Sequence, residues 1–163
     1  MEILLAKPRG LCAGVVRAVE IVEQALELYG APIYVLHQIV HNQKVVRDLE
    51  ERGVVFTEEL GAIPAGGVTI FSAHGVGRQV TEKARTLGLD PIDATCPLVT
   101  KVHLQARKYS REGREVIIIG HRDHVEVRGT LGQLEGPARV VATAAEAEGL
   151  EVSDPDRLAY VTQ

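Results

Sequence analysis

The chain has 163 residues with 18 basic and 22 acidic side chains, a formal net charge of −4, and 45% hydrophobic residues. This composition is typical of a soluble globular protein. It lacks the basic excess of a nucleic-acid-binding surface, and no apolar run approaches the roughly 20 residues that a membrane-spanning helix needs. We therefore expect no nucleic-acid partner and no membrane association, and the absence of a signal-peptide pattern at the N-terminus favours the cytoplasm.

Short apolar runs alternate along the chain with segments that have helical spacing. Strands are predicted at residues 2–6, 32–36, 54–56, 68–73, 91–94, 115–120, 138–142 and 158–162. Helices are predicted at residues 15–29, 41–53, 78–88, 98–113, 125–134 and 144–149. Strands that alternate with helices of this length are typical of parallel sheets covered on both faces. The sequence therefore predicts an α/β fold of two tandem, small three-layer units with mostly parallel sheets, divided near Cys96 into residues 1–96 and 97–163.

Cysteine and histidine gather directly after the predicted strands. The residues in question are Cys12, His37, His41, His74, Cys96, His121 and His124, with Glu126 nearby. Ligands of open parallel sheets bind beyond the carboxyl ends of the strands. The pattern therefore indicates a functional site at that edge.

Each of these residues alone also has an ordinary structural explanation, because a lone buried cysteine usually acts as a small apolar side chain. As a set they fit three chemistries. A zinc site could use His121, His124 and the two cysteines. Cys12, at the start of a helix, could be a nucleophile. Thiolates could instead hold an iron–sulfur cluster beside an anion gripped by histidines. The residue types alone leave these alternatives open.

Five motifs then occur in a fixed order: PRGLCAGV at 8–15, VHNQKVV at 40–46, FSAHGV at 71–76, DATCPLVTKVH at 93–103 and GHRDHVEVRGTLGQ at 120–133. Together they resemble the 4-hydroxy-3-methylbut-2-enyl diphosphate reductases, iron–sulfur oxidoreductases of the non-mevalonate route of isoprenoid biosynthesis. The resemblance spans nearly the whole chain but only about the first half of a family member. It implies a pseudo-symmetric fold of three α/β units, of which residues 1–96 and 97–163 are two and the third lies outside this chain.

The resemblance also implies roles for individual residues. Cys12 and Cys96 match two of the three cysteines that hold a [4Fe–4S] cluster. His41, His74 and His124 match histidines that bind the substrate, and Glu126 matches the proton donor. The family removes an allylic hydroxyl to give isopentenyl and dimethylallyl diphosphate, with electrons from a small carrier such as ferredoxin or flavodoxin.

Two other functions remain open at this point: a non-catalytic diphosphate-binding fragment, and a zinc-binding α/β module. Because an apolar face would be left uncovered without the third unit, we also expect the isolated chain to self-associate.

Overall fold

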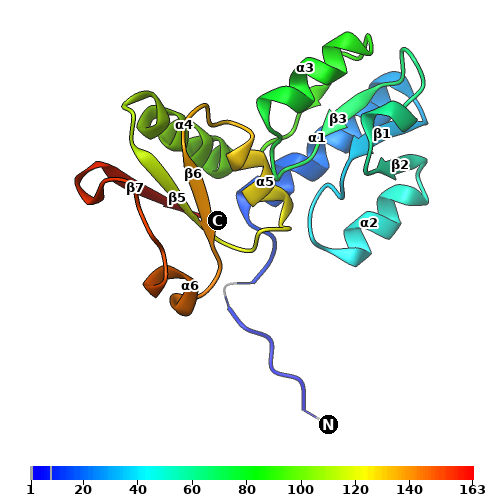
Figure 1. Cartoon of the computed structure of the whole chain (residues 1–163). Helices are drawn as coiled ribbons and strands as arrows, with labels where there is room; N and C mark the ends of the chain where they lie inside the picture. Colours follow the sequence, from blue (N-terminus) through cyan, green and yellow to red (C-terminus); the bar gives the residue numbers. More distant parts are fainter. Residues whose placement is uncertain (1, 8) are drawn as a thin grey trace.

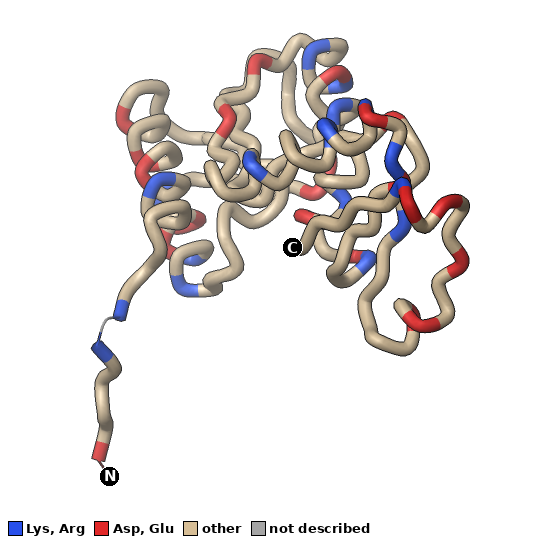
Figure 2. The backbone as a smooth tube through the Cα atoms, turned by 90° about the vertical axis from the view of Figure 1, so that its left-hand side faces the viewer, with Lys and Arg blue, Asp and Glu red and all other residues tan. Residues whose placement is uncertain are grey.

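The computed structural model describes residues 2–7 and 9–163. Pro8, the first residue of the PRGLCAGV motif, lies outside the described residues. The chain forms two parallel sheets, one of four strands and one of three, which lie side by side in Figure 1. The predicted α/β fold with parallel sheets is therefore confirmed. Figure 2 shows basic and acidic residues interspersed over both parts of the molecule.

The first sheet has the strand order β2-β1-β3-β4, and all neighbouring strands run parallel. Its strands are β1 (Ile33–Leu36), β2 (Val54–Thr57), β3 (Thr69–Phe71) and β4 (Ile92–Asp93). Helices α1 (Ala13–Tyr29) and α2 (Gln43–Glu50) share one apolar core with the sheet, whereas α3 (Arg78–Thr86) contributes to a second core. A short 3₁₀ helix, η1 (Leu60–Ala62), adds Leu60 to this second core.

The second sheet has the order β6-β5-β7 and is also parallel. Its strands are β5 (Glu115–Ile119), β6 (Ala138–Val141) and β7 (Leu158–Thr162). Helices α4 (Pro97–Arg111) and α5 (Val125–Leu131) bury one face of the sheet, while α6 (Ala144–Glu148) and the 3₁₀ helix η2 (Pro155–Arg157) lie in the connection between β6 and β7. The other face carries Ile119 and Tyr160, which are 43% and 71% exposed.

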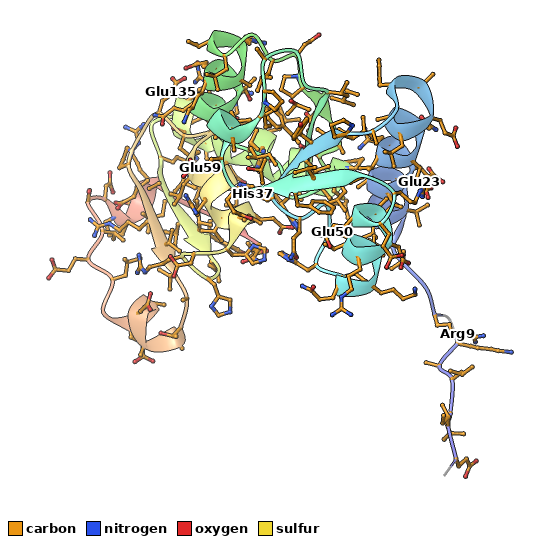
Figure 3. All side chains as sticks on the ribbon, turned by 90° about the vertical axis from the view of Figure 1, so that its right-hand side faces the viewer. Arg9, Glu23, His37, Glu50, Glu59 and Glu135 are labelled. Carbon is orange, nitrogen blue, oxygen red and sulfur yellow. The ribbon has the colours of Figure 1, made fainter. Side chains whose placement is uncertain are left out.

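The predicted strand at residues 2–6 is wrong. These residues form no strand, and Ile3, Leu4 and Leu5 are 66–85% exposed. In Figure 1 the N-terminal segment extends away from both sheets, and Figure 3 shows Arg9 on that segment, apart from the body of the molecule. An apolar run can be a strand only where another strand offers it hydrogen bonds, and within the described residues none lies beside it.

Local sequence signals explain where several helices begin. Asn42 precedes α2, and its side-chain Oδ1 accepts hydrogen bonds from the backbone N–H groups of Lys44 and Val45. Pro97 is the first residue of α4, a position where its missing N–H is not needed. No helix in the described part of the chain combines the length and apolar character needed to cross a bilayer.

Candidate functional site

A cavity of about 350 Å³ lies where the carboxyl ends of β1 and β3 meet the first turns of α1, α4 and α5. Its walls carry chemically active residues from both parts of the chain. The lining residues are Leu11, Cys12, Gly14, Val15, Val40, His41, Asn42, Ala73, His74, Cys96, Val99 and Glu126. Five of the six residues predicted to form the site therefore line one cavity, although they come from five separate parts of the sequence.

The two cysteines stand at equivalent places, each directly before a helix. Cys12 is the N-cap of α1 and Cys96 is the N-cap of α4, and both thiols are free. A Cβ atom added to Gly14 would lie 2.4 Å from Sγ of Cys96 and 4.0 Å from Sγ of Cys12. The separation of the sulfurs therefore cannot exceed the sum of these distances. Both thiols face one small volume that is kept open by the missing side chain of Gly14.

This geometry suits thiolate ligands of a shared inorganic group. Helix N-termini stabilise nearby negative charge, and each sulfur lies at such a terminus. Within residues 2–7 and 9–163, no group of three or more His, Cys, Asp or Glu side chains is arranged to hold a single metal ion. His121 and His124, which the zinc alternative would combine with the two cysteines, do not line the cavity that holds both thiols.

Three imidazole rings form a cluster at the side of the cavity. The ring centroids of His41 and His74 lie 4.2 Å apart, and His124 lies 5.1 Å from His41 and 6.1 Å from His74. His124 is the one predicted site residue that does not line the cavity. It is instead the N-cap of α5, where its Nδ1 accepts a hydrogen bond from the backbone N–H of Glu126. If neutral, His124 must therefore carry its proton on Nε2.

His74 and Glu126 form a pair that joins the two parts of the chain. Nδ1 of His74 lies 3.0 Å from Oε1 of Glu126, and His74 is only 5% exposed. This hydrogen bond is the largest cause of a lowered pKa for Glu126, and electrostatic interactions with His74, His124 and His41 add to it against the opposing effect of burial. Nε2 of His74 is buried, and it has no hydrogen-bond partner among the described residues.

His41 is poised to gain a proton when an anion binds. Burial lowers its pKa most, repulsion from His74 and His124 lowers it further, and Glu126 partly opposes these effects. A bound anion would cancel the repulsion and favour the charged imidazole. Three clustered imidazoles, one with an unpartnered buried nitrogen, can therefore donate several hydrogen bonds to a phosphate-type ligand.

Other residues noted at the ends of strands lie elsewhere. His37 has a positive φ of 61° and pairs with Glu58, with 2.7 Å between Nδ1 and Oε2. Neither His37, which is labelled in Figure 3, nor His121 lines the cavity. His103 is buried but does not line the cavity, and burial lowers its pKa.

Two of the lining residues that were not predicted as part of the site, Gly14 and Asn42, have clear roles there. Gly14 is necessary for the space around the thiols, but a glycine beside a cysteine also fits an ordinary turn. Asn42 both caps α2 and faces the cavity. Asn42 could have been found from the sequence, because it lies next to His41 and directly before a helical pattern.

Comparison with known proteins places these features in a family. Residues 3–163 match the family model described as LytB protein. The chain is 57% identical over 162 residues to 4-hydroxy-3-methylbut-2-enyl diphosphate reductase of Azoarcus sp. (strain BH72), covering 99% of this chain and 52% of that protein. It is 56% identical to the protein of the same name from Methylococcus capsulatus, covering 100% of this chain and 53% of the relative. The chain thus spans about half the length of the curated relatives that it matches.

Solved structures show the same similarity. The E-1-hydroxy-2-methyl-but-2-enyl-4-diphosphate reductase from Plasmodium falciparum superposes with a TM-score of 0.92 at 43% identity, over 96% of this chain and 49% of that one. A second structure, (E)-4-hydroxy-3-methyl-but-2-enyl diphosphate reductase, described as the terminal enzyme of the non-mevalonate pathway, gives a TM-score of 0.80 at 34% identity, over 99% of this chain and 57% of that one. With a family match over nearly its entire length, the chain belongs to the LytB protein family.

Proposed function

We propose that this chain forms the N-terminal half of a 4-hydroxy-3-methylbut-2-enyl diphosphate reductase. The observation that carries the proposal is the convergence of Cys12, Cys96, His41, His74 and Glu126 on one cavity. The names of the relatives support the same reaction. In that reaction the allylic C–O bond breaks, two electrons and two protons are taken up, and the hydroxyl leaves as water. The products would be isopentenyl and dimethylallyl diphosphate.

Cys12 and Cys96 would hold a [4Fe–4S] cluster. The space beside Gly14 supports this assignment, because a side chain there would collide with the Cys96 thiol. A third cysteine ligand would come from outside these 163 residues. When bound, the cluster would supply the electrons and a Lewis-acidic iron to weaken the C–O bond. Its electrons would come from a small carrier such as ferredoxin or flavodoxin. A reducing cytoplasm would keep the two cysteines from forming a disulfide.

The three histidines would bind the diphosphate. His41, His74 and His124 lie within 4.2–6.1 Å of one another, measured between ring centroids, so one diphosphate group can contact more than one ring. The buried, unpartnered Nε2 of His74 supports a ligand at this place, since a buried polar atom is costly without a partner. Binding there would orient the hydroxyl end of the substrate toward the thiols.

Glu126 would deliver a proton to the departing hydroxyl. Its pKa is lowered in the free chain, chiefly by His74, so the isolated carboxyl is ionised at neutral pH. Diphosphate bound among the histidines brings negative charge close to Glu126, which favours its protonated form. The His74–Glu126 pair can hold a proton between two atoms 3.0 Å apart. The proton donor is therefore best described as this pair, with Glu126 as its acidic end.

Anaerobic turnover of the complete protein tests the proposal. With iron and sulfide restored and a reduced electron carrier present, we expect 4-hydroxy-3-methylbut-2-enyl diphosphate to be converted into the two isomeric products, detected by chromatography. A protein that carries a full cluster and binds pyrophosphate, but yields neither product, would contradict the reductase and favour a non-catalytic diphosphate-binding role.

A further inference from the structure

Residues 74–77 lie along one face of α5 in three successive contacts. On α5 the contacting positions are Glu126, Gly129 and Gly132, the last being its C-cap. Positions three apart lie on the same face of a helix. The segment and the helix therefore meet in a defined register. The three contacts pair His74 with Glu126, Gly75 with Gly129, and Gly77 with Gly132.

The contact at Gly132 leaves no room for a side chain, and the contact at Gly129 is tight. A Cβ atom added to Gly132 would lie 2.6 Å from Cα of Gly77, and one added to Gly129 would lie 3.1 Å from the carbonyl oxygen of Gly75. Carbon atoms in favourable contact are about 3.5–4.0 Å apart. We call the four residues Gly75, Gly77, Gly129 and Gly132 the glycine seam. Backbone meets backbone here, between the two parts of the chain.

The segment is also packed against α4 and the residues before it. A Cβ atom on Gly75, which has a positive φ of 71°, would lie 2.7 Å from Cε1 of His103 and 3.0 Å from Cγ2 of Thr95. His103, on α4, is only 7% exposed. Because the segment is held by these contacts, we expect added volume between the segment and α5 to displace α5.

Hydrogen bonds hold the seam closed. The backbone N–H of Arg78 donates to the carbonyl oxygen of Gly132 over 3.0 Å. Nε2 of Gln133 donates to the carbonyl oxygen of Val76 over 2.6 Å, and the side chains of Arg78 and Glu135 form an ion pair. These bonds tie the end of α5 directly to the start of α3.

We propose that Gly129 and Gly132 are positioning residues that set the distance between His74 and Glu126. The seam fixes the C-terminal end of α5 against residues 74–77. Glu126 lies on the same face of the helix, about one turn from Gly129 and two turns from Gly132. A displacement of α5 by about 1 Å, which a methyl group at position 132 would require, therefore separates the His74–Glu126 pair. The consequence for turnover rests on the proposed function, whereas the geometric claim does not.

A graded series of alanine variants in the complete protein tests the inference. The distances predict the order of effect: Gly132→Ala largest, Gly129→Ala smaller, and Gly149→Ala none, since a Cβ on Gly149 would make an ordinary contact of 3.6 Å to Ala145. Crystal structures should show the distance from His74 Nδ1 to Glu126 Oε1 lengthened by about 1 Å in Gly132→Ala. Turnover should fall about 10²-fold, because misplacement on this scale has that cost.

A second variant guards against a failure to fold. Gln133→Ala removes the hydrogen bond to Val76 without adding volume, and it should also lengthen the His74–Glu126 distance and reduce turnover several-fold. An unchanged distance in the folded variants would overturn the inference. In an active parent protein, a lengthened distance with unchanged turnover would overturn the consequence for turnover. If the distance lengthens in the expected order but the parent protein has no reductase activity, the seam stands and the proposed function fails.

Discussion

Glu126 is proposed to donate a proton, but its carboxyl is ionised in the free chain. Its pKa is lowered, first by the hydrogen bond with His74 and then by three imidazoles, yet a proton donor must hold a proton when the substrate is bound. The substrate's own negative charge supplies the opposing effect. The Glu126 carboxyl is therefore expected to gain its proton only in the substrate complex.

Replacing Glu126 by Gln tests this role. The amide keeps the size of the side chain but has no acidic proton, so turnover of the complete protein should fall about 10²–10⁴-fold, the usual contribution of a general acid. Cluster absorbance should remain at the parent level, because Glu126 is not a proposed ligand. Near-parent turnover in Glu126→Gln would remove the proton-donor role.

The histidine cluster predicts pH-dependent anion binding. The pKa of His41 lies below its ordinary value in the free chain, first because of burial and then because of His74 and His124. A bound anion raises this pKa, so binding takes up a proton, and affinity must increase as the pH falls through the range between the free and bound pKa values. Calorimetric titration with inorganic pyrophosphate should show up to about tenfold tighter binding per pH unit for each proton gained.

Two controls make this measurement specific. Titrations in buffers with different ionisation enthalpies should reveal the proton uptake directly. His41→Gln should flatten the pH dependence, whereas His121→Gln, outside the cavity, should leave it unchanged. Affinity that is independent of pH in the parent protein would contradict the assignment of the cluster as an anion site.

At the scale of elements, the start of α2 places His41 beside the cavity. Asn42 caps this helix through two backbone N–H groups, at 3.1 and 3.2 Å. Asn42→Ala should therefore lower the free energy of unfolding by about 1 kcal/mol, measured by urea denaturation. Asn42→Asp keeps the acceptor oxygen and should change it by only a few tenths. Equal losses in the two variants would show that the cap contributes little.

The parallel-strand pattern made the position of several site residues predictable. Successive parallel strands end at the same edge of a sheet, so His41 after β1, His74 after β3 and Cys96 after β4 were expected to lie close together. The cavity that they line confirms this expectation. Periodicity and composition were sufficient here because the arrangement depends only on strand direction and order.

Contacts between the two parts of the chain were not predictable in the same way. The His74–Glu126 pair joins residues 52 positions apart, and its geometry depends on backbone contacts between glycines of different elements. Nothing in a periodic pattern encodes such a register. The strand predicted at residues 2–6 failed for a related reason: its apolar pattern was clear, but a strand also needs a neighbour, and the described residues provide none.

At the scale of the whole molecule, exposed apolar surface marks the open side of the second sheet. Ile119 and Tyr160 lie on the face opposite the α4–α5 core, with Tyr160 71% exposed. Further large apolar residues are exposed on the N-terminal segment. Surfaces of this kind commonly drive association, so self-association of the isolated chain stays a prediction.

Sedimentation velocity over a range of concentrations tests it. The isolated 163-residue chain should shift to larger species as its concentration rises, and the double variant Ile119→Lys, Tyr160→Lys should shift less. Tyr29→Lys, at the end of α1, is the matched control and should behave as the parent does. A parent chain that remains monomeric at every concentration would refute the prediction.

Iron content after anaerobic reconstitution of the complete protein tests the central claim most directly. If the thiols beside Gly14 hold the cluster, the parent should bind iron and sulfide in the ratio of a [4Fe–4S] centre. Cys12→Ser and Cys96→Ser should each lose most of both, while His121→Ala should keep the parent level. Full iron and sulfide content in either cysteine variant would contradict the account.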